Sequence, residues 1–97
     1  MADRAYYVYI LTNRYDNVLY IGVTNDLVRR MYEHKAGYCS HSFTKRNRVD
    51  KLVYFETASC AYATISREKE LKGWSRDRKI KLIEEANPDW LDLSDGL

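Results

Sequence analysis

The chain has 97 residues, of which 31% are charged and 45% hydrophobic, a composition typical of one soluble globular domain. No apolar run approaches the ~20 residues needed to cross a bilayer, and the N-terminal residues lack the long apolar segment of a signal peptide. Two cysteines give no disulfide framework. We therefore expect a single cytoplasmic domain over residues 1–97.

The net charge of +2 conceals an uneven distribution of charge along the chain. Residues 1–83 contain all 16 Lys and Arg with nine acids, a formal charge of +7, whereas residues 84–97 contain five acids and no base. A basic body suits a polyanion such as nucleic acid, although a charge run alone is more often a solvated surface. We expect a core over about 5–86 and an acidic tail over 87–97.

Hydrophobic periodicity predicts three strands. Residues 5–13 and 18–23 are rich in Tyr, Val and Ile and flank a turn over 14–17, so they should pair as a hairpin, and residues 51–56 should form the third strand. The strands are apolar on both faces, which indicates that helices cover the sheet. A turn centred between Arg14 and Tyr15 would place Tyr9 and Tyr20 opposite each other on one face.

The first helix is expected over about residues 26–35. At ~100° per residue, Arg30 and His34 fall together at the edge of its apolar face, because they are four residues apart. Two neighbouring side chains that carry positive charge or protons suit a shared anion. The apolar face itself is expected to contain Leu27, Val28, Met31 and Tyr32.

Two more helices are expected, over about 58–72 and 75–86, the latter stopped by Asn87-Pro88. Residues that favour helix ends flank the predicted helices. The candidates are Thr24 or Asn25 before the first helix, Gly37 after it, and Thr57 or Ser59 before the second. We expect the tail to pack back on the body through Trp90, Leu91 and Leu93.

Glu68 lies within the face of the second helix that we expect to be apolar. A carboxylate facing the core is costly in free energy unless it is paired or bound to a ligand. An ion pair with Lys72, one turn further along, is one interpretation, and a functional ligand is the other; helix geometry leaves both open. The apolar residues of this face are Ala58, Ala61, Ile65 and Leu71.

Several short motifs occur in a characteristic order along the chain. Tyr7-Val8-Tyr9 and Tyr20-Ile21-Gly22 lie on the hairpin, "DLVRRMYEH" carries Arg30 and His34, and "ISREKELKGW" carries Glu68. Together these motifs resemble the GIY-YIG nuclease family over roughly residues 5–86. The chain is most similar to the family's small single-domain bacterial branch, which is like the N-terminal domain of the GIY-YIG component of the bacterial excision-repair nuclease.

The resemblance implies an α/β (α+β) domain with the GIY-YIG endonuclease fold, in which helices flank a central three-stranded antiparallel sheet. It also implies a metal-dependent endonuclease that hydrolyses phosphodiester bonds of nucleic acid, with DNA favoured, and a connection to DNA repair. One Mg²⁺ or Mn²⁺ ion would be the cofactor. Because the chain has no room for an attached DNA-reading module, sequence specificity should be low, and a protein partner could supply it.

The resemblance also implies roles for five residues. Glu68 would bind the metal ion, Arg30 would hold the scissile phosphate, and His34 would assist proton transfer or phosphate binding. Tyr9 and Tyr20 would position or activate the attacking water, or one of them would be the nucleophile. A fixed guanidinium and a metal ion stabilise the charge that develops on the phosphate, and Mg²⁺ needs only one or two carboxylates.

Basic residues around this site are expected to contact phosphates. The candidates are Arg29, Lys45, Arg46, Arg48, Lys72 and Arg76. Tyr38 and Phe43 lie among these bases, as aromatic residues do in single-strand binders, but a solvated loop explains them equally well. A zinc site built from Cys39, His41, Cys60 and His34 is disfavoured, because the spacing matches no paired-ligand pattern.

The sequence departs from the family pattern at two places. Tyr7 occupies the position of the family's first glycine, and Val23-Thr24 stand where some members carry a lysine, so lysine-assisted activation of water is absent or moved. The alternative function is a non-catalytic nucleic-acid-binding or adaptor domain that retains the fold. A structural protein-interaction module is a third possibility. The intact set of five site residues argues against both alternatives, because a decayed enzyme would be free to lose any of them.

Overall fold

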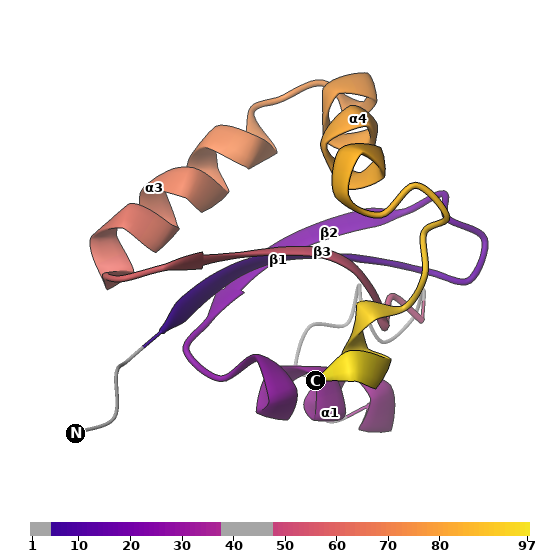
Figure 1. The fold of residues 1–97 in the computed structure, drawn as a ribbon, viewed down its shortest axis with the longest axis horizontal. Coiled ribbons are helices and arrows are strands. Elements are labelled where there is room, and N and C mark those ends of the chain that lie inside the picture. Colours follow the sequence, from indigo (N-terminus) through magenta and orange to yellow (C-terminus); the bar gives the residue numbers. More distant parts are fainter. Residues whose placement is uncertain (1–4, 38–47) are drawn as a thin grey trace.

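The computed structural model describes residues 5–37 and 48–97, and its elements form three layers (Figure 1). An antiparallel sheet with strand order β2-β1-β3 lies in the middle, covered by α3 and α4 on one face and by α1 and the 3-10 helix η1 on the other. The expected α+β architecture is confirmed. The bounds are β1 Tyr6–Thr12, β2 Leu19–Thr24, α1 Leu27–Ala36, β3 Lys51–Ala58, α3 Ala61–Lys72, α4 Arg76–Ala86 and η1 Leu93–Gly96.

The central strand β1 is buried on both faces of the sheet. Val8 and Ile10 point into a core beneath α3 and α4, which we call the upper core, and both are at most 1% exposed. Tyr9 and Leu11 point into a second core against α1, the lower core, and are fully buried. The prediction that helices cover both faces is therefore confirmed, and β1 fixes the position of both layers.

The hairpin register differs from the sequence prediction. Tyr9 pairs with Gly22, and Tyr20 pairs with Leu11, so the two tyrosines share a face but are diagonal neighbours rather than opposite each other. The centre of the turn lies one residue further along the chain than predicted. Asp16 adopts the left-handed conformation (φ 56), which Asp tolerates, and its N–H donates to the carbonyl of Asn13.

Helix α1 touches the sheet along a narrower stripe than periodicity suggested. Leu27, Met31 and His34 are buried, whereas Val28 and Tyr32 are exposed, so those two were wrongly predicted to face the core. The N-cap is Asp26, whose carboxylate accepts from the N–H of Arg29, and is neither Thr24 nor Asn25. The predicted stop at Gly37 is confirmed, with φ 77, a conformation that favours glycine.

The start and orientation of α3 were also predicted incorrectly. Strand β3 continues to Ala58, and Cys60 is the N-cap, with its sulfur accepting from the N–H of Ala63. Thr64 and Leu71 are the residues buried against the sheet, while Ala61 and Ile65 are exposed. Because a hydroxyl can be buried when it is hydrogen-bonded, Thr64 takes the place that sequence patterning gave to Ile65; its Oγ1 donates to the carbonyl of Cys60.

The acidic tail packs against both layers. The predicted stop of α4 at Asn87 is confirmed, and its buried amide donates to the carbonyl of Val53 at 3.0 Å. Trp90 joins the upper core and Leu93 packs on the lower core as expected, but Leu91 is exposed.

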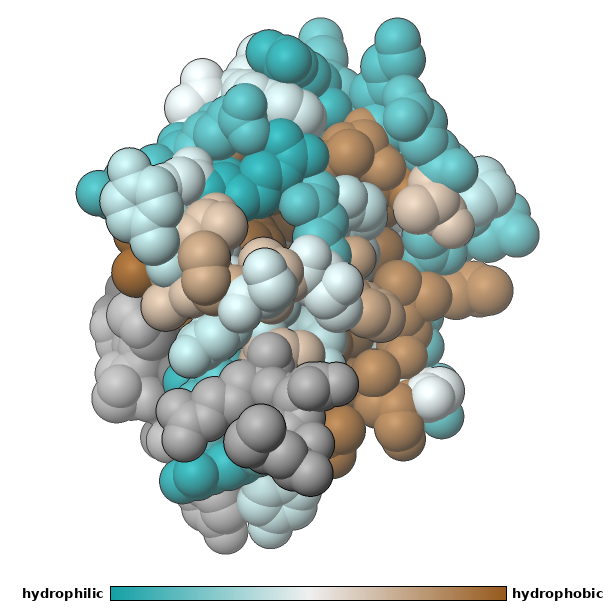
Figure 2. Space-filling model, turned by 60° about the vertical axis from the view of Figure 1, so that its left-hand side comes forward, coloured by the Kyte–Doolittle hydropathy of each residue, from teal (hydrophilic) through white to brown (hydrophobic). Residues whose placement is uncertain are grey.

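The surface over the α3–α4 layer is mainly hydrophilic, while apolar residues gather along one flank of the face in Figure 2. No helix in the described ranges is long and apolar enough to span a bilayer.

A charged network joins β3 to α3. The Glu56 carboxylate accepts hydrogen bonds from the Arg67 guanidinium at 2.8–3.3 Å and from the hydroxyl of Tyr54. The hydrogen bonds from Arg67 are the main cause that holds the pKa of Glu56 below its ordinary value of 4.5; partial burial opposes this shift, and the Tyr54 hydrogen bond adds to it. The ionised carboxylate therefore stabilises the contact between the sheet and α3.

This network predicts a loss of stability in acid. Because the pKa of Glu56 is lowered by folding, its contribution is complete above the ordinary value of 4.5 and is lost as the pH falls below it. The free energy of unfolding of the parent should fall more steeply between about pH 5 and 3 than that of Glu56→Gln. Urea titrations across this range measure the slopes, with Glu85→Gln on α4 as control. Parallel slopes for parent and Glu56→Gln would contradict the assignment.

Candidate active site

Three aromatic rings from three elements meet beneath the sheet. Tyr9 of β1, Tyr20 of β2 and His34 of α1 have ring centroids 6.0–6.5 Å apart. The hydroxyl of Tyr9 lies 3.4 Å from Nε2 of His34, and both residues are buried. Tyr20 is only half-buried, so it connects this cluster to solvent. The fold thus joins two phenol groups and an imidazole that are far apart in the sequence.

Gly22 makes room for this arrangement. A Cβ atom at this position would lie 2.5 Å from the hydroxyl oxygen and 2.6 Å from Cζ of Tyr9, closer than real Cβ atoms approach. Since Tyr9 and Gly22 are directly paired across the hairpin, the phenol ring of Tyr9 extends over the glycine. The glycine of the Tyr20-Ile21-Gly22 motif therefore serves a steric purpose, which pattern matching by itself did not reveal.

Arg30 lies one helical turn before His34 on α1. Its Nε is 3.3 Å from the carboxylate of Glu33, which also pairs with Arg29 at 3.3 Å. The two arginines border a small cavity of about 170 Å³, whose lining carries two guanidinium groups and two carboxylates. The other lining residues are Thr24, Asn25, Asp26 and Glu33. This polar cavity at the start of α1 is large enough for a phosphate group.

Glu68 lies in the other helical layer. It belongs to α3, which covers the face of the sheet opposite to α1 (Figure 1), and its side chain is 18% exposed. Its carboxylate pairs with Lys72 at 3.1 Å, so the ion pair that helix geometry left open is present. The other four predicted residues come from β1, β2 and α1. The sheet therefore separates the helix that carries Glu68 from the helix that carries Arg30 and His34.

The edge strand β2 connects the two layers. Helix α1 follows it directly, and α3 packs on it as well as on β1. Thr24, the last residue of β2, and Asn25, which follows it, line both the Arg30 cavity and a mostly apolar cavity of about 170 Å³ beside Thr64 and Ile65. Glu68 lies one helical turn beyond these two α3 residues. The Thr24-Asn25 segment thus borders both the Arg30 cavity and the first half of α3, one turn before Glu68.

The remaining basic residues are scattered. Arg29 lies beside Arg30, while Arg76 donates to the carbonyl of Asn17 at 2.9 Å and ties α4 to the hairpin. Arg48 lies near the hairpin turn rather than near α3. Lys45, Arg46, Tyr38, Phe43, Cys39 and His41 lie outside the described residues. Within the described ranges, no group of three His, Cys, Asp or Glu side chains is placed to hold a metal ion.

One available carboxylate fits magnesium better than zinc. Mg²⁺ retains several water ligands and is commonly held by one or two protein carboxylates together with substrate phosphates, whereas structural zinc needs four close nitrogen or sulfur ligands. Cys60, which was considered for zinc, is an exposed N-cap. The partly buried Glu68 carboxylate is therefore compatible with a magnesium site shared with substrate, on condition that Lys72 can be displaced.

The aromatic cluster, the adjacent arginine and the three-layer fold define a class of protein. The sequence matches the GIY-YIG catalytic domain over residues 5–81, and the chain belongs to this family. Its membership confirms the family resemblance and indicates relationship to nucleases.

Relatives of similar length share most of the chain. It is 40% identical over 81 residues to a UPF0213 protein of Haloquadratum walsbyi, covering 84% of this chain and 89% of that protein. It is 41% identical over 80 residues to a UPF0213 protein of Staphylococcus haemolyticus, covering 82% and 95%. The NMR structure of a UPF0213 protein from Bacillus halodurans superimposes with a TM-score of 0.57 and 26% identity, covering 91% and 92%. The chain therefore groups with small single-domain GIY-YIG proteins.

The close approach at Gly22 predicts a steric effect of substitution. Gly22→Ala should displace the Tyr9 ring and lower the free energy of unfolding by about 1–3 kcal/mol, the usual cost of overpacking, or several degrees in Tm. Gly96→Ala, where nothing lies within 4 Å of the added atom, is the control. Thermal unfolding and the chemical shifts of the His34 ring report the two effects. Unchanged stability and shifts in Gly22→Ala would refute the steric role.

Proposed function

We propose that this protein is a metal-dependent endonuclease that hydrolyses phosphodiester bonds of nucleic acid, with DNA as the favoured substrate and low sequence specificity. The observation that carries the proposal is the buried contact of Tyr9 with His34, beside Tyr20 and one turn from Arg30, in a chain of the GIY-YIG family. A structural core has no need to bring two phenol groups and an imidazole together on one face of a sheet, with a guanidinium one helical turn away.

Each of these residues has a task that its position supports. Arg30 would bind the scissile phosphate at the polar cavity, where its guanidinium can form charge-assisted hydrogen bonds with two oxygens. Tyr20, which is half-buried, would orient the attacking water, and Tyr9 would hold His34 through the 3.4 Å contact. His34 would accept a proton, because a neutral imidazole ring carries one unprotonated nitrogen that can act as a general base.

Glu68 would bind one Mg²⁺ or Mn²⁺ ion. Such an ion supplies charge stabilisation for a phosphate oxygen and for the leaving group. The approach of substrate phosphate would compete with the Glu68 carboxylate for Lys72, whose ammonium lies 3.1 Å away. Arg29, Lys72 and Arg76 would contact flanking phosphates, and a protein partner would supply sequence specificity.

One observation favours the second candidate, a non-catalytic nucleic-acid-binding or adaptor domain. Glu68 is paired with Lys72 on the layer opposite to α1, an arrangement that a purely structural carboxylate would also adopt. The two candidates differ in turnover. A panel of labelled single-stranded, duplex and branched DNA and RNA, incubated with and without Mg²⁺ or Mn²⁺, separates them, because a pure protein that binds but cuts none of these substrates is an adaptor.

Substitution of Glu68 tests the proposed metal ligand. Glu68→Gln keeps the shape of the side chain and removes its charge, so the variant should fold, bind DNA at least as tightly as the parent, and lose cleavage by about a hundredfold or more. Glu70→Gln, on the same helix and 54% exposed, is the control that should cut normally. Cleavage and binding are measured on one labelled substrate. Normal cleavage by Glu68→Gln would show that the metal ligand lies elsewhere.

Substitution of Arg30 tests the phosphate contact. Arg30→Ala should weaken DNA binding and lower cleavage by about a hundredfold, equivalent to about 3 kcal/mol of lost transition-state stabilisation. Arg30→Lys should restore part of the binding but little of the cleavage, because an ammonium cannot form the paired hydrogen bonds of a guanidinium. Single-turnover rates and equilibrium binding are compared for the three proteins. Equal cleavage rates for all three would remove Arg30 from the site.

A further inference from the structure

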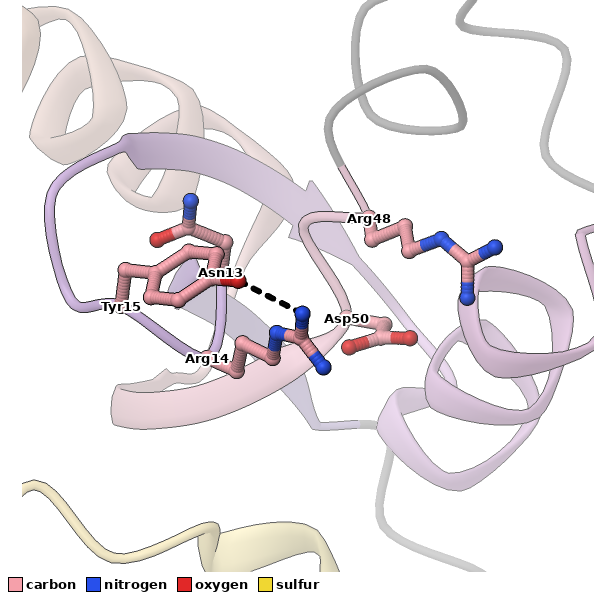
Figure 3. A pocket seen from close by; sticks show the side chains of 5 residues that line it. All are labelled: Asn13, Arg14, Tyr15, Arg48 and Asp50. Carbon is pink, nitrogen blue, oxygen red and sulfur yellow. Dashed lines mark hydrogen bonds between the residues drawn. The ribbon is translucent and has the colours of Figure 1, made fainter.

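A separate polar pocket lies beside the tip of the β1–β2 hairpin (Figure 3). It has a volume of about 570 Å³, larger than the cavity beside Arg30. Its lining comes from two segments far apart in the sequence, the end of β1 with the hairpin turn and the residues that lead into β3. The residues are Asn13, Arg14, Tyr15, Arg48 and Asp50.

The pocket carries an excess of positive charge. Arg14 and Arg48 line it with Asp50 as the one carboxylate, and Figure 3 shows Asp50 between the two arginine side chains. The nearby carboxylate of Asp16 is already paired with Lys51 at 2.9 Å. None of the ion pairs between described residues involves Arg14 or Arg48. Two guanidinium groups that line one pocket from different segments suit a phosphate, to which a guanidinium can donate two hydrogen bonds.

Arg48 is held in an unusual backbone conformation. Its φ is 52, in the left-handed region that residues other than glycine rarely adopt. The following Val49 is buried in the lower core, and the N–H of Asp50 donates to the carbonyl of Arg48 at 3.1 Å. The buried Val49 and this hydrogen bond hold Arg48 in the strained conformation beside the pocket. Strained positions of this kind concentrate at functional sites.

Tyr15 presents an ordered aromatic surface at the same pocket. The Arg14 side chain donates to the Tyr15 hydroxyl at 2.6 Å, and its guanidinium carbon lies 4.8 Å from the ring centroid, so the two side chains hold each other in place. Tyr15 nevertheless stays 66% exposed. An exposed phenol ring fixed beside two arginines resembles the stacking platforms of proteins that bind single-stranded nucleic acid.

The pocket lies close enough to the aromatic cluster to share a ligand with it. Tyr20 pairs with Leu11 across the hairpin, and the pocket residue Asn13 follows Leu11 by two residues. At ~3.4 Å per residue, Leu11 and Asn13 are about 7 Å apart, which is about the length of two nucleotides in a stacked strand. A nucleic acid strand that enters the cluster at Tyr20 could therefore extend over the hairpin tip.

We infer that the hairpin pocket binds an unpaired stretch of the nucleic acid substrate next to the cleavage site, with Arg14 and Arg48 on a phosphate and a base stacked on Tyr15. The inference rests on the proposed function and adds a substrate class to it, namely nucleic acid with a single-stranded segment beside the bond to be cut. Asp50 limits the affinity, because its carboxylate faces the same phosphate.

Binding of a labelled single strand and of a duplex with the same sequence, in the absence of divalent metal, tests the inference. Tyr15→Leu should weaken binding of the single strand about fivefold or more and leave the duplex nearly unchanged. Tyr62→Leu, an exposed tyrosine on α3 (82%), is the control and should change neither. Equal effects of Tyr15→Leu on both probes, or none, would overturn the stacking role.

The arginines and Asp50 give effects of opposite sign. Arg14→Gln and Arg48→Gln should each weaken binding of the single strand and reduce its salt slope by about 0.7, the value for one lost phosphate contact, whereas Lys81→Gln on α4 should not. Asp50→Asn should tighten binding. The inference would be overturned if the salt slope stayed unchanged in both arginine variants, or if Asp50→Asn weakened binding of the single strand. It would also be overturned if polyglutamate, a polyanion without bases, competed for the protein as effectively as unlabelled single strand does.

The controls also separate this inference from the proposed function. Parent protein that binds neither probe would overturn the nuclease proposal, and the inference with it. Parent protein that binds and cuts, while every pocket variant behaves like its control, would overturn the inference alone. Circular dichroism confirms that each variant is folded, which is expected because Arg14, Tyr15 and Arg48 are exposed.

Discussion

The packing of Tyr9 across Gly22 is the constraint on which the rest of the structure depends. Tyr9 is fully buried in the strand that both layers share, and its ring reaches the neighbouring strand only because that strand offers no side chain at the point of contact. The ring then forms one wall against which His34 packs, and His34 sets the rotation of α1. Placement of the helix, and with it of Arg30, follows from this contact.

Burial of polar groups explains why α1 and α3 are oriented differently from their apolar patterns. His34 occupies a core position on α1 and Thr64 occupies one on α3, while Val28 and Ile65 face solvent. A hydrophobicity pattern assigns the apolar residue to the core in each case. The observed rotation instead satisfies Thr64 by a hydrogen bond to the carbonyl of Cys60 and brings His34 to Tyr9.

Much of the architecture could be predicted from the sequence, because strand alternation, turn residues and helix stops are local signals. These local signals correctly predicted the three strands, the hairpin, the three long helices and the helix stops at Gly37 and Asn87. The hairpin register was not, since it depended on Asp16 adopting a left-handed conformation. Likewise, motif order indicated five site residues, but could not reveal that Glu68 belongs to a different layer from His34. The pocket at the hairpin tip unites residues 13–15 with 48–50, a juxtaposition that only the folded chain provides.

The tail also bears on how copies of this protein behave at high concentration. In a three-stranded sheet, β2 and β3 are both edges, and an edge with vacant amides invites pairing with a strand from another molecule. Asp92 in the tail accepts the amide of Leu52 on β3 at 3.2 Å. Burial alone would raise the pKa of the Asp92 carboxyl, but hydrogen bonds from Lys35, Ser94 and Leu52 outweigh burial and lower that pKa, so the carboxylate stays ionised and paired with Lys35 at this edge. The tail thereby occupies a backbone amide of β3 that a strand from another molecule would otherwise need for pairing.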